Sequence, residues 1–370
     1  MYKQIPLAKP NLKGNELRYV TECINTGWIS SAGKFVEEFE SKFADFCGVK
    51  HGISCCNGTV AIHLALLAVG IKEGDEVIIP NYTFAATANA ILYCGAKPIL
   101  IDAEKDTWCI NPKLIKDKIT KNTKAIIPVH IYGHPCNMDP IMEIAKENNL
   151  FVIEDCAEAH GAEYKSKDGT WRQVGSIGNI GCFSFYGNKI ISTGEGGMCT
   201  TNNEKLADKM RLLKDHGMKK GKRYWHDIIG YNYRLTNIQA AVGLAQLEKI
   251  DEFIEKRIKI AKKYNELLKD VKGIILPPEK EWAKNVFWLY CILINDFPIS
   301  RDELIIKLKE NGIDSRKFFY PLNIMQPYKD DSSYPISKII SEKGICLPTY
   351  CELSEDGIEK IVECIKKVSN

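Results

Sequence analysis

The chain has 370 residues, of which 45% are hydrophobic and 26% are charged, and its formal net charge is +3. This length allows one large domain and a smaller one, and the small net charge gives no indication of nucleic acid or an anionic membrane as a partner. The N-terminus MYKQIPLAKP lacks an apolar signal-peptide core, and no apolar run approaches membrane-spanning length, so we expect a cytoplasmic protein. The 14 cysteines include no C-x-x-C pair, and many lie in apolar segments, so we expect reduced core residues.

The first informative stretch is a predicted strand, turn and helix. Helices are expected over 13–24 and, from apolar residues at helical spacing, over 35–46. A strand is then predicted over 51–56 and an apolar helix over 60–69, with Asn57-Gly58-Thr59 as the turn between them. A helix N-terminus with a glycine and a threonine hydroxyl can bind a phosphate, although Asn and Thr are also ordinary N-caps.

Strands and helices then alternate. The expected strands are 76–80, 97–102, 124–129 and 150–154, and the expected helices are 84–94, 112–119 and 140–148. Strands of continuous apolar residues between amphipathic helices predict a largely parallel sheet that is covered on both faces. In such a sheet a ligand lies beyond the carboxyl ends of the strands, so the residues that follow each strand are candidate site residues.

Asp155 ends the strand LFVIED. Its carboxylate can hold a protonated pyridine nitrogen, which makes such a ring an electron sink, or it can be a solvated strand-end residue or a helix cap. His130, His134 and Cys136 lie after the preceding strand, but no second cluster completes a metal site. We therefore predict no metal here and expect substrate contact or loop packing instead.

Lys189 lies in GCFSFYGNKIISTGEGGM, between an alternating apolar run and a glycine-rich loop. Partial burial lowers the pKa of an amine, and a neutral amine is a nucleophile, as a Schiff-base lysine requires. The alternative is a surface lysine in a turn.

The rest of the chain contains a basic loop and a second domain. A strand (197–201) and a helix (204–215) precede Lys219, Lys220, Lys222 and Arg223, which are solvated or face a substrate pyrophosphate. A helical pattern over 237–269 ends before Pro277-Pro278, and a strand (287–294), a helix (302–311) and a final amphipathic helix follow. We expect a large cofactor-binding domain over 1–250 and a smaller one over 251–370.

Three features thus occur in a fixed order on one predicted sheet: a phosphate-binding helix start, a strand-end aspartate and a lysine after a later strand. They are the three anchors that pyridoxal phosphate (PLP) needs, for its phosphate, its ring nitrogen and its aldehyde carbon. No G-x-G-x-x-G follows the first strand, which argues against a nicotinamide oxidoreductase.

The chain resembles the sugar aminotransferases of the DegT/DnrJ/EryC1/StrS family, which have the aspartate-aminotransferase (PLP fold type I) architecture. The resemblance covers nearly the whole length and is carried by CNGTVAIHLAL, GDEVIIPNYTFAATANAI, KAIIPVHIYGHPCNMD, VIEDCAEAHGA, GCFSFYGNKIISTGEGGM and RYWHDIIGYNYRLTNIQAAVGLAQLE. It implies an α/β fold, with a large domain whose mostly parallel sheet lies between helices and a smaller α+β C-terminal domain.

The resemblance also implies roles. Lys189 would be the catalytic lysine that binds PLP, and Asp155 would contact the ring nitrogen. The other cofactor residues would be Gly58, Thr59 and Ser184 at the phosphate, Phe84 against a ring face, Glu158 beside the ring hydroxyl, and Asn232 at the phosphate of the other subunit's cofactor in a homodimer. The substrate residues would be His160, Arg223, Tyr224, Trp225 and Asn323.

Lys189 favours transamination, since relatives with histidine at this position are dehydratases. IYGHPCNMD and the last three motifs are most similar to members that form GDP-perosamine for O-antigens or other glycans. This implies amino transfer from L-glutamate to C4 of GDP-4-keto-6-deoxymannose. Asn323 departs from the F-Y-P-x-H pattern of those members and cannot carry a positive charge, and the PNYTFAAT loop is closer to the wider family. A UDP- or dTDP-4-keto-6-deoxyglucose substrate, a PLP-dependent dehydratase, an amino-acid transaminase and a non-catalytic regulatory relative therefore stay open.

Overall fold

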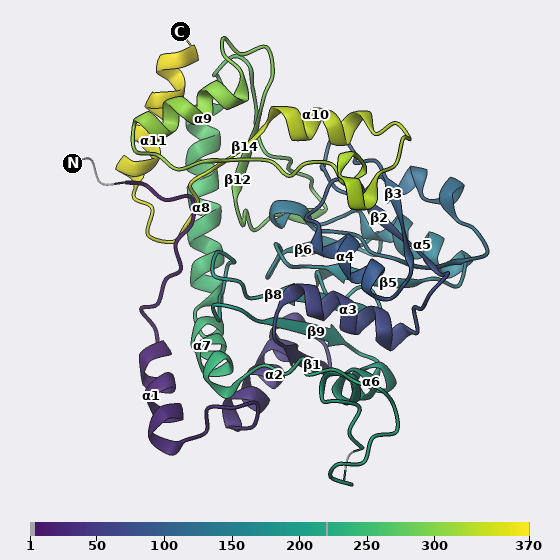
Figure 1. Ribbon diagram of the computed structural model, residues 1–370. Helices are drawn as coiled ribbons and strands as arrows, with labels where there is room; N and C mark the ends of the chain where they lie inside the picture. The colour runs from purple at the N-terminus through teal and green to yellow at the C-terminus, as the bar shows by residue number, and fades with distance from the viewer. Residues whose placement is uncertain (1–3, 220, 370) are drawn as a thin grey trace.

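A seven-stranded sheet forms the centre of the larger part of the molecule (Figure 1), in a computed structural model that describes residues 4–219 and 221–369. Its strand order is β1 (His51–Cys55), β9 (Gly197–Thr201), β8 (Ile180–Ser184), β5 (Phe151–Asp155), β4 (Thr123–Ile126), β2 (Glu76–Pro80) and β3 (Lys97–Ile101). The pairs from β8 to β3 are parallel, and β9 is antiparallel to both of its neighbours. The prediction of a largely parallel sheet is confirmed.

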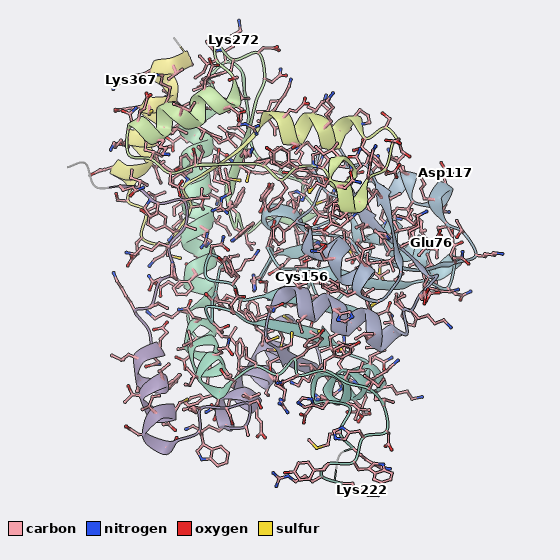
Figure 2. The ribbon with its side chains drawn as sticks, viewed as in Figure 1. Glu76, Asp117, Cys156, Lys222, Lys272 and Lys367 are labelled. Atoms are coloured by element: carbon pink, nitrogen blue, oxygen red, sulfur yellow. The ribbon has the colours of Figure 1, made fainter. Side chains whose placement is uncertain are left out.

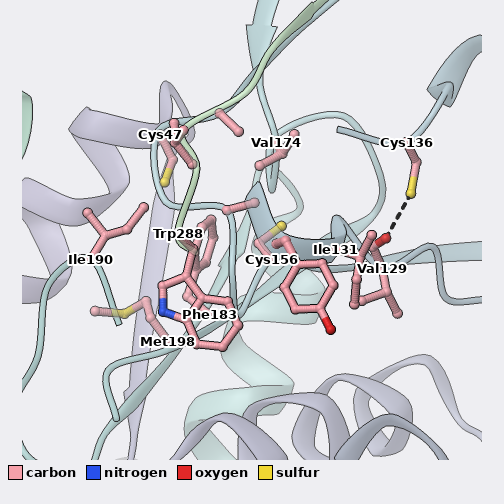
Figure 3. Packing of buried hydrophobic residues seen from close by; sticks show 14 of the residues in the cluster. Cys47, Val129, Ile131, Cys136, Cys156, Val174, Phe183, Ile190, Met198 and Trp288 are labelled. Atoms are coloured by element: carbon pink, nitrogen blue, oxygen red, sulfur yellow. Dashed lines mark hydrogen bonds between the residues drawn. The ribbon is translucent and has the colours of Figure 1, made fainter. Parts of the chain in front are cut away.

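Helices cover both faces of this sheet, because alternate strand residues point into two separate hydrophobic clusters. In β5, Val152 belongs to one cluster and Ile153 to the other. The Val152 side packs against α2 (Lys34–Cys47), α5 (Met138–Glu147) and α7 (Asn237–Leu247), and the Ile153 side against α3 (Gly58–Val69), α4 (Ala86–Tyr93) and α6 (Glu204–Lys214). Figure 3 shows part of the first cluster, including Phe183, Cys156 and Trp288. Burial on both faces explains why the strands are continuously apolar.

A second, antiparallel sheet of four strands lies in the C-terminal third of the chain. Its order is β10 (Ile274–Ile275), β12 (Tyr290–Ile294), β14 (Gly344–Leu347) and β13 (Arg316–Lys317). A third cluster joins β12 and β14 to α8 (Ile250–Leu268), α9 (Arg301–Glu310) and α11 (Glu355–Ser369), while α10 (Pro335–Lys343) leads into β14. The long α8 follows α7 along one side of the molecule, and α1 (Glu16–Thr26) lies beside α7 (Figure 1). The domain boundary at residue 250 stays a prediction.

Several predicted elements differ from the structure for local reasons. The segment 112–119 forms two short 3₁₀ turns, Pro112–Leu114 and Lys116–Lys118, although its buried residues Pro112 and Ile115 are at helical spacing. The strand predicted from residue 287 begins at Tyr290, since Phe287 has φ 47°. The helical pattern over 237–269 is divided between α7 and α8 at Lys249, whose φ is −118°.

Two further expectations concern the cysteines and the membrane. All 14 cysteines are free, and 11 of them are buried, which confirms that they are core thiols rather than a disulfide framework. Within residues 4–219 and 221–369, no helix combines the length and apolar character needed to cross a membrane. The sequence patterns did not predict the small sheet of β6 (Glu163–Lys165), β7 (Trp171–Gln173) and β11 (Ala283–Lys284).

Candidate active site

A cavity of about 680 Å³ opens at the carboxyl ends of β5 and β8, beside the N-terminus of α3. It brings together most of the residues that the sequence predicted for cofactor binding. Those that line it are Gly58, Thr59, Phe84, Asp155, Glu158, Ser184 and Lys189. Residues that are up to 131 positions apart along the chain thus converge on one space, as strand ends do at the edge of a parallel sheet.

The start of α3 packs directly against the end of β8. A Cβ atom on Gly58 would lie 2.7 Å from the Cβ of Ser184 and 3.0 Å from its Oγ, so only glycine fits there. Asn57 caps the helix, because its side chain accepts a hydrogen bond of 2.9 Å from the amide of Val60. The first amides of a helix have no partner within the helix, and the dipole favours an anion at this end. Ser184 and Thr59 add hydroxyl groups, and this donor set suits a phosphate.

The glycine-rich loop after Lys189 has a packing role. A Cβ atom on Gly197 would lie 2.4 Å from the carbonyl oxygen of Asn57 and 3.0 Å from the Sγ of Cys55. Gly197 also pairs with Cys55 in the β1–β9 ladder. The loop therefore lets β9 approach the turn before α3 closely, and this approach fixes the turn against the sheet.

Asp155 ends β5 and is 5% exposed. Its Oδ2 accepts a hydrogen bond of 2.8 Å from the Thr87 hydroxyl, and its Oδ1 accepts one of 3.1 Å from the amide of Ala157. Burial raises the pKa of Asp155, and the hydrogen bonds and the charge of Lys189 oppose that rise. The carboxylate is thus held in a fixed orientation at the cavity wall and lacks a close counter-ion in the described part of the chain.

Lys189 follows β8 in a turn in which its amide donates to the carbonyl of Tyr186 at 2.9 Å. Its Nζ lies 4.0 Å from Oε1 of Glu158, and the other oxygen of Glu158 accepts a hydrogen bond of 2.8 Å from the amide of Tyr132. Burial lowers the pKa of Lys189, while the charges of Glu158 and Asp155 oppose this shift. Burial also raises the pKa of Glu158 to about 7. Burial thus favours the neutral, nucleophilic form of the Lys189 amine, which covalent catalysis by a lysine requires.

The sequence patterns missed several residues of this cavity. Thr87 orients Asp155 from α4, and Trp288, Phe319 and Arg316 line the cavity from the C-terminal part of the chain. The ring of Phe319 lies 5.6 Å from that of Phe84, so an aromatic wall joins the two parts of the molecule. No local motif marks these positions, because their role depends on packing between distant segments.

His160 and Asn232 are among the predicted residues that lie outside the cavity of this chain. His160 is fully buried against Phe183 and Phe185, with ring centroids 5.4 and 5.7 Å away. Burial lowers its pKa to about 3, so its imidazole is neutral and is not placed to touch a substrate. Asn232 is exposed, and its Oδ1 accepts a hydrogen bond of 2.8 Å from Arg234. Its expected contact with another subunit's cofactor stays a prediction.

Arg223, Tyr224 and Trp225 lie on an exposed loop between α6 and α7 that projects from the body of the molecule, with Lys222 near its tip (Figure 2). Lys222 and Arg223 lie over the rings of Trp225 and Tyr224, 3.6 and 4.9 Å from the ring centroids. Lys220 of the predicted basic loop is outside the described residues. None of the loop residues named here lines the cavity, so their contact with a nucleotide sugar stays a prediction.

Asn323 is also absent from the cavity lining, and it forms a reciprocal amide pair with the buried Asn81. Asn81 Nδ2 donates to Asn323 Oδ1 at 2.9 Å, and the amide of Asn323 donates to Asn81 Oδ1 at 2.9 Å. The pair fixes the segment after Phe319 to the end of β2. This geometry gives Asn323 a structural role, and its contact with a substrate stays a prediction.

His130, Glu154 and Cys156 bring three potential metal-ligand atoms within 4.8 Å of one another. His134 and Cys136, the other members of the predicted loop, are not in this group. The carboxylate of Glu154 accepts hydrogen bonds of 2.7 to 2.9 Å from the amides of Gly175, Ile177 and Gly178, and one oxygen lies 3.1 Å from His130 Nε2. Glu154 thus ties the loop at residues 175–178 to β5.

Comparison with known proteins places this site in a family. The model of the DegT/DnrJ/EryC1/StrS aminotransferase family matches residues 10–366. GDP-perosamine synthase from Caulobacter vibrioides is 47% identical over 369 residues, which cover 99% of this chain and 98% of that protein. The aminotransferase from Psychrobacter cryohalolentis superposes with a TM-score of 0.92 at 32% identity over the whole of both chains. The putative sugar aminotransferase Spr1654 from Streptococcus pneumoniae, in its PMP form, superposes with a TM-score of 0.93 at 27% identity, and the match covers 99% of this chain and 98% of that one. The predicted fold is confirmed.

Proposed function

The chain belongs to the DegT/DnrJ/EryC1/StrS aminotransferase family, and from this premise we propose that it uses PLP to transfer an amino group from L-glutamate to C4 of a nucleotide-linked 4-keto-6-deoxyhexose. The observation that carries the proposal is the convergence of Lys189, Asp155 and the Gly58–Ser184 contact on one cavity. Membership of a PLP-dependent family supports the cofactor, and relatives that form GDP-perosamine support the substrate class.

The residues of the cavity fit PLP. Gly58, Thr59 and Ser184 form a cradle that a side chain at position 58 would fill, at the positive end of α3. Asp155 is a buried carboxylate, and a protonated pyridine nitrogen would supply the counter-charge that it lacks. Phe84, with 58% of its surface exposed, offers a free ring face to the cavity.

When bound, PLP supplies an electron sink that stabilises negative charge at the carbon next to the reacting nitrogen. The residues of the chain do the rest. Lys189 is the base that takes a proton from the amino donor and the acid that returns it, and its lowered pKa suits both tasks. Asp155 keeps the ring nitrogen protonated. Glu158 lies 4.0 Å from the Lys189 amine and orients it. Trp288 and Phe319 line the cavity from the C-terminal part of the chain.

GDP-4-keto-6-deoxymannose is the substrate that we propose first, with GDP-perosamine as the product. The 47% identity to a GDP-perosamine synthase over nearly the whole chain supports it. A UDP- or dTDP-4-keto-6-deoxyglucose is the second candidate. Asn323 favours this alternative, because it replaces a histidine of the perosamine-type pattern and its side-chain oxygen accepts a hydrogen bond from Asn81.

We also propose a homodimer in which each subunit completes the other's site. Asn232 and the Arg223–Trp225 loop lie outside the cavity of their own chain and are exposed, as residues that reach another subunit must be before assembly. Tyr224 and Trp225 are 74% and 49% exposed, and contact with a second copy would bury this apolar surface.

The test is a substrate panel. Protein loaded with PLP is incubated with L-glutamate and, in separate reactions, the GDP-, UDP- and dTDP-linked 4-keto-6-deoxyhexoses. Products are identified by mass and by the C4 configuration from NMR. The proposal expects 2-oxoglutarate and a 4-amino sugar from at least one nucleotide sugar, with the GDP sugar preferred. Loss of a ring hydroxyl without gain of nitrogen would instead identify a dehydratase and contradict the proposal.

A further inference from the structure

The amine of Lys189 lies over the face of an indole ring. Its Nζ is 3.9 Å from the ring centroid of Trp288, close enough for a strong cation–π interaction. The quadrupole of an aromatic ring attracts a charged ammonium group strongly and a neutral amine only weakly. The contact therefore distinguishes the two protonation states of Lys189, and nothing in the proposed reaction so far uses it.

Trp288 is fixed from three sides. Its Nε1 donates a hydrogen bond of 2.7 Å to the carbonyl of Asn188, the neighbour of Lys189. Its own carbonyl accepts one of 2.8 Å from the buried Arg257 of α8, and the ring of Tyr132 is stacked at 6.3 Å with planes 15° apart. Trp288 is 4% exposed and lies among the buried side chains of the core (Figure 3). A ring held in this way offers a face in a defined position.

Tyr132 also controls the other side of the amine. Its amide binds Glu158, whose Oε1 is 4.0 Å from Lys189 Nζ, and its φ of 53° is unusual for an aromatic residue. The Lys189 amine is thus near both the indole face of Trp288 and the carboxylate of Glu158, and Tyr132 contacts both of these residues. Asp155 also faces this space, and the other titratable or charged groups of the cavity wall are Arg316, Glu195, Tyr93 and Tyr186. The neutral His160 lies outside the cavity.

We propose that Trp288 is a positioning residue, whose indole face holds the charged amine of Lys189 between taking up a proton and returning it. The catalytic meaning of this inference rests on the proposed function. The contact between Lys189 and Trp288 involves only residues of the chain, so its effect can be measured on the cofactor-free protein. Because the ring stabilises the charged form, its removal should lower the pKa of Lys189 and leave the amine without a fixed orientation.

The experiment compares Trp288→Leu and Trp288→Phe with the unmodified chain, each as full-length protein freed of cofactor. A trace of an acylating reagent labels neutral amines across a pH series, and peptide mass spectrometry gives the extent at Lys189. Phe319→Leu is the matched control, since it removes another aromatic side chain of the cavity wall, which packs against Phe84 and not against the amine of Lys189. Circular dichroism verifies that each variant is folded.

The pH midpoint of acylation at Lys189 should fall by roughly 0.5 to 1 pKa unit in Trp288→Leu and by less in Trp288→Phe. In Phe319→Leu we expect this midpoint to stay unchanged. Trp288→Phe is also expected to recover part of the rate that Trp288→Leu loses, with a shifted pH profile. An unchanged midpoint in both Trp288 variants would overturn the inference. Failure of the unmodified, PLP-loaded protein to form 2-oxoglutarate from L-glutamate would overturn the proposed function instead, so the two failures are distinguishable.

Discussion

Replacing Glu158 by glutamine should change how the stability of the cofactor-free protein depends on pH. Glu158 is 5% exposed, and burial raises its pKa from 4.5 to about 7 even though the charge of Lys189 opposes the rise. The folded protein therefore retains a proton that the unfolded chain has already released between these two pH values. Ionisation of the buried Glu158 lowers the free energy of unfolding. This loss is absent below about pH 4.5, grows as the pH rises through the window, and is complete above about pH 7.

The size of this cost follows from the two pKa values. At about 1.4 kcal/mol per pKa unit, the difference between 4.5 and about 7 corresponds to about 3 kcal/mol. Glutamine stays neutral, and its carbonyl can still accept the hydrogen bond from the amide of Tyr132. The free energy of unfolding of Glu158→Gln, relative to the unmodified chain, should therefore increase by about 3 kcal/mol between about pH 4.5 and about pH 8.

Urea unfolding of the cofactor-free proteins at one protein concentration, at several pH values in this range, measures the difference. Glu266→Gln on the exposed side of α8 is the matched control, and its difference from the unmodified chain should stay constant with pH. A constant difference for Glu158→Gln would refute the reasoning, because it would mean that burial does not hold a proton on this carboxyl group.

Three further substitutions test the site. Gly58→Ala should weaken PLP binding at least tenfold, because the new Cβ would lie 2.7 Å from the Cβ of Ser184. In the control Gly187→Ala, the new Cβ meets nothing nearer than 4.0 Å, so PLP binding measured by absorbance titration should not weaken. Asp155→Asn should lower the turnover rate by about 10²-fold or more and unfolding free energy far less, and equal losses would favour a structural role. Asn323→Ala should lower the free energy of unfolding by about 1 to 3 kcal/mol in urea titrations, since it leaves the buried side-chain amide of Asn81 without its partner. A loss of substrate affinity with unchanged stability would instead support a substrate contact of Asn323.

The sequence allowed the inner part of the site to be predicted, because its residues follow strands. Asp155 ends β5, and Lys189 follows the end of β8 by five residues. Since the carboxyl ends of parallel strands lie at one edge of a sheet, recognising the strands was enough to place both side chains together. The turn before α3 was predictable for the same reason.

The contribution of the C-terminal part of the chain was not predictable, because it depends on contacts between distant segments. Trp288 lies 100 positions from the carbonyl that it binds, and Asn81 and Asn323 are 242 positions apart. No periodicity or motif relates such residues. The failed helix over 112–119 has a different origin, since its apolar residues suit a helix locally and only tertiary packing decides that two of them are buried.

The central claim is that Lys189 performs amino transfer in this cavity. Its most direct test mixes the PLP-loaded protein with L-glutamate in the absence of any sugar and measures 2-oxoglutarate in a single turnover, alongside Lys189→Ala. We predict about one 2-oxoglutarate per site from the unmodified chain and a rate lower by at least about 10³-fold for the variant, as the loss of a general base and acid implies. Equal rates for the two proteins would contradict the assignment of Lys189.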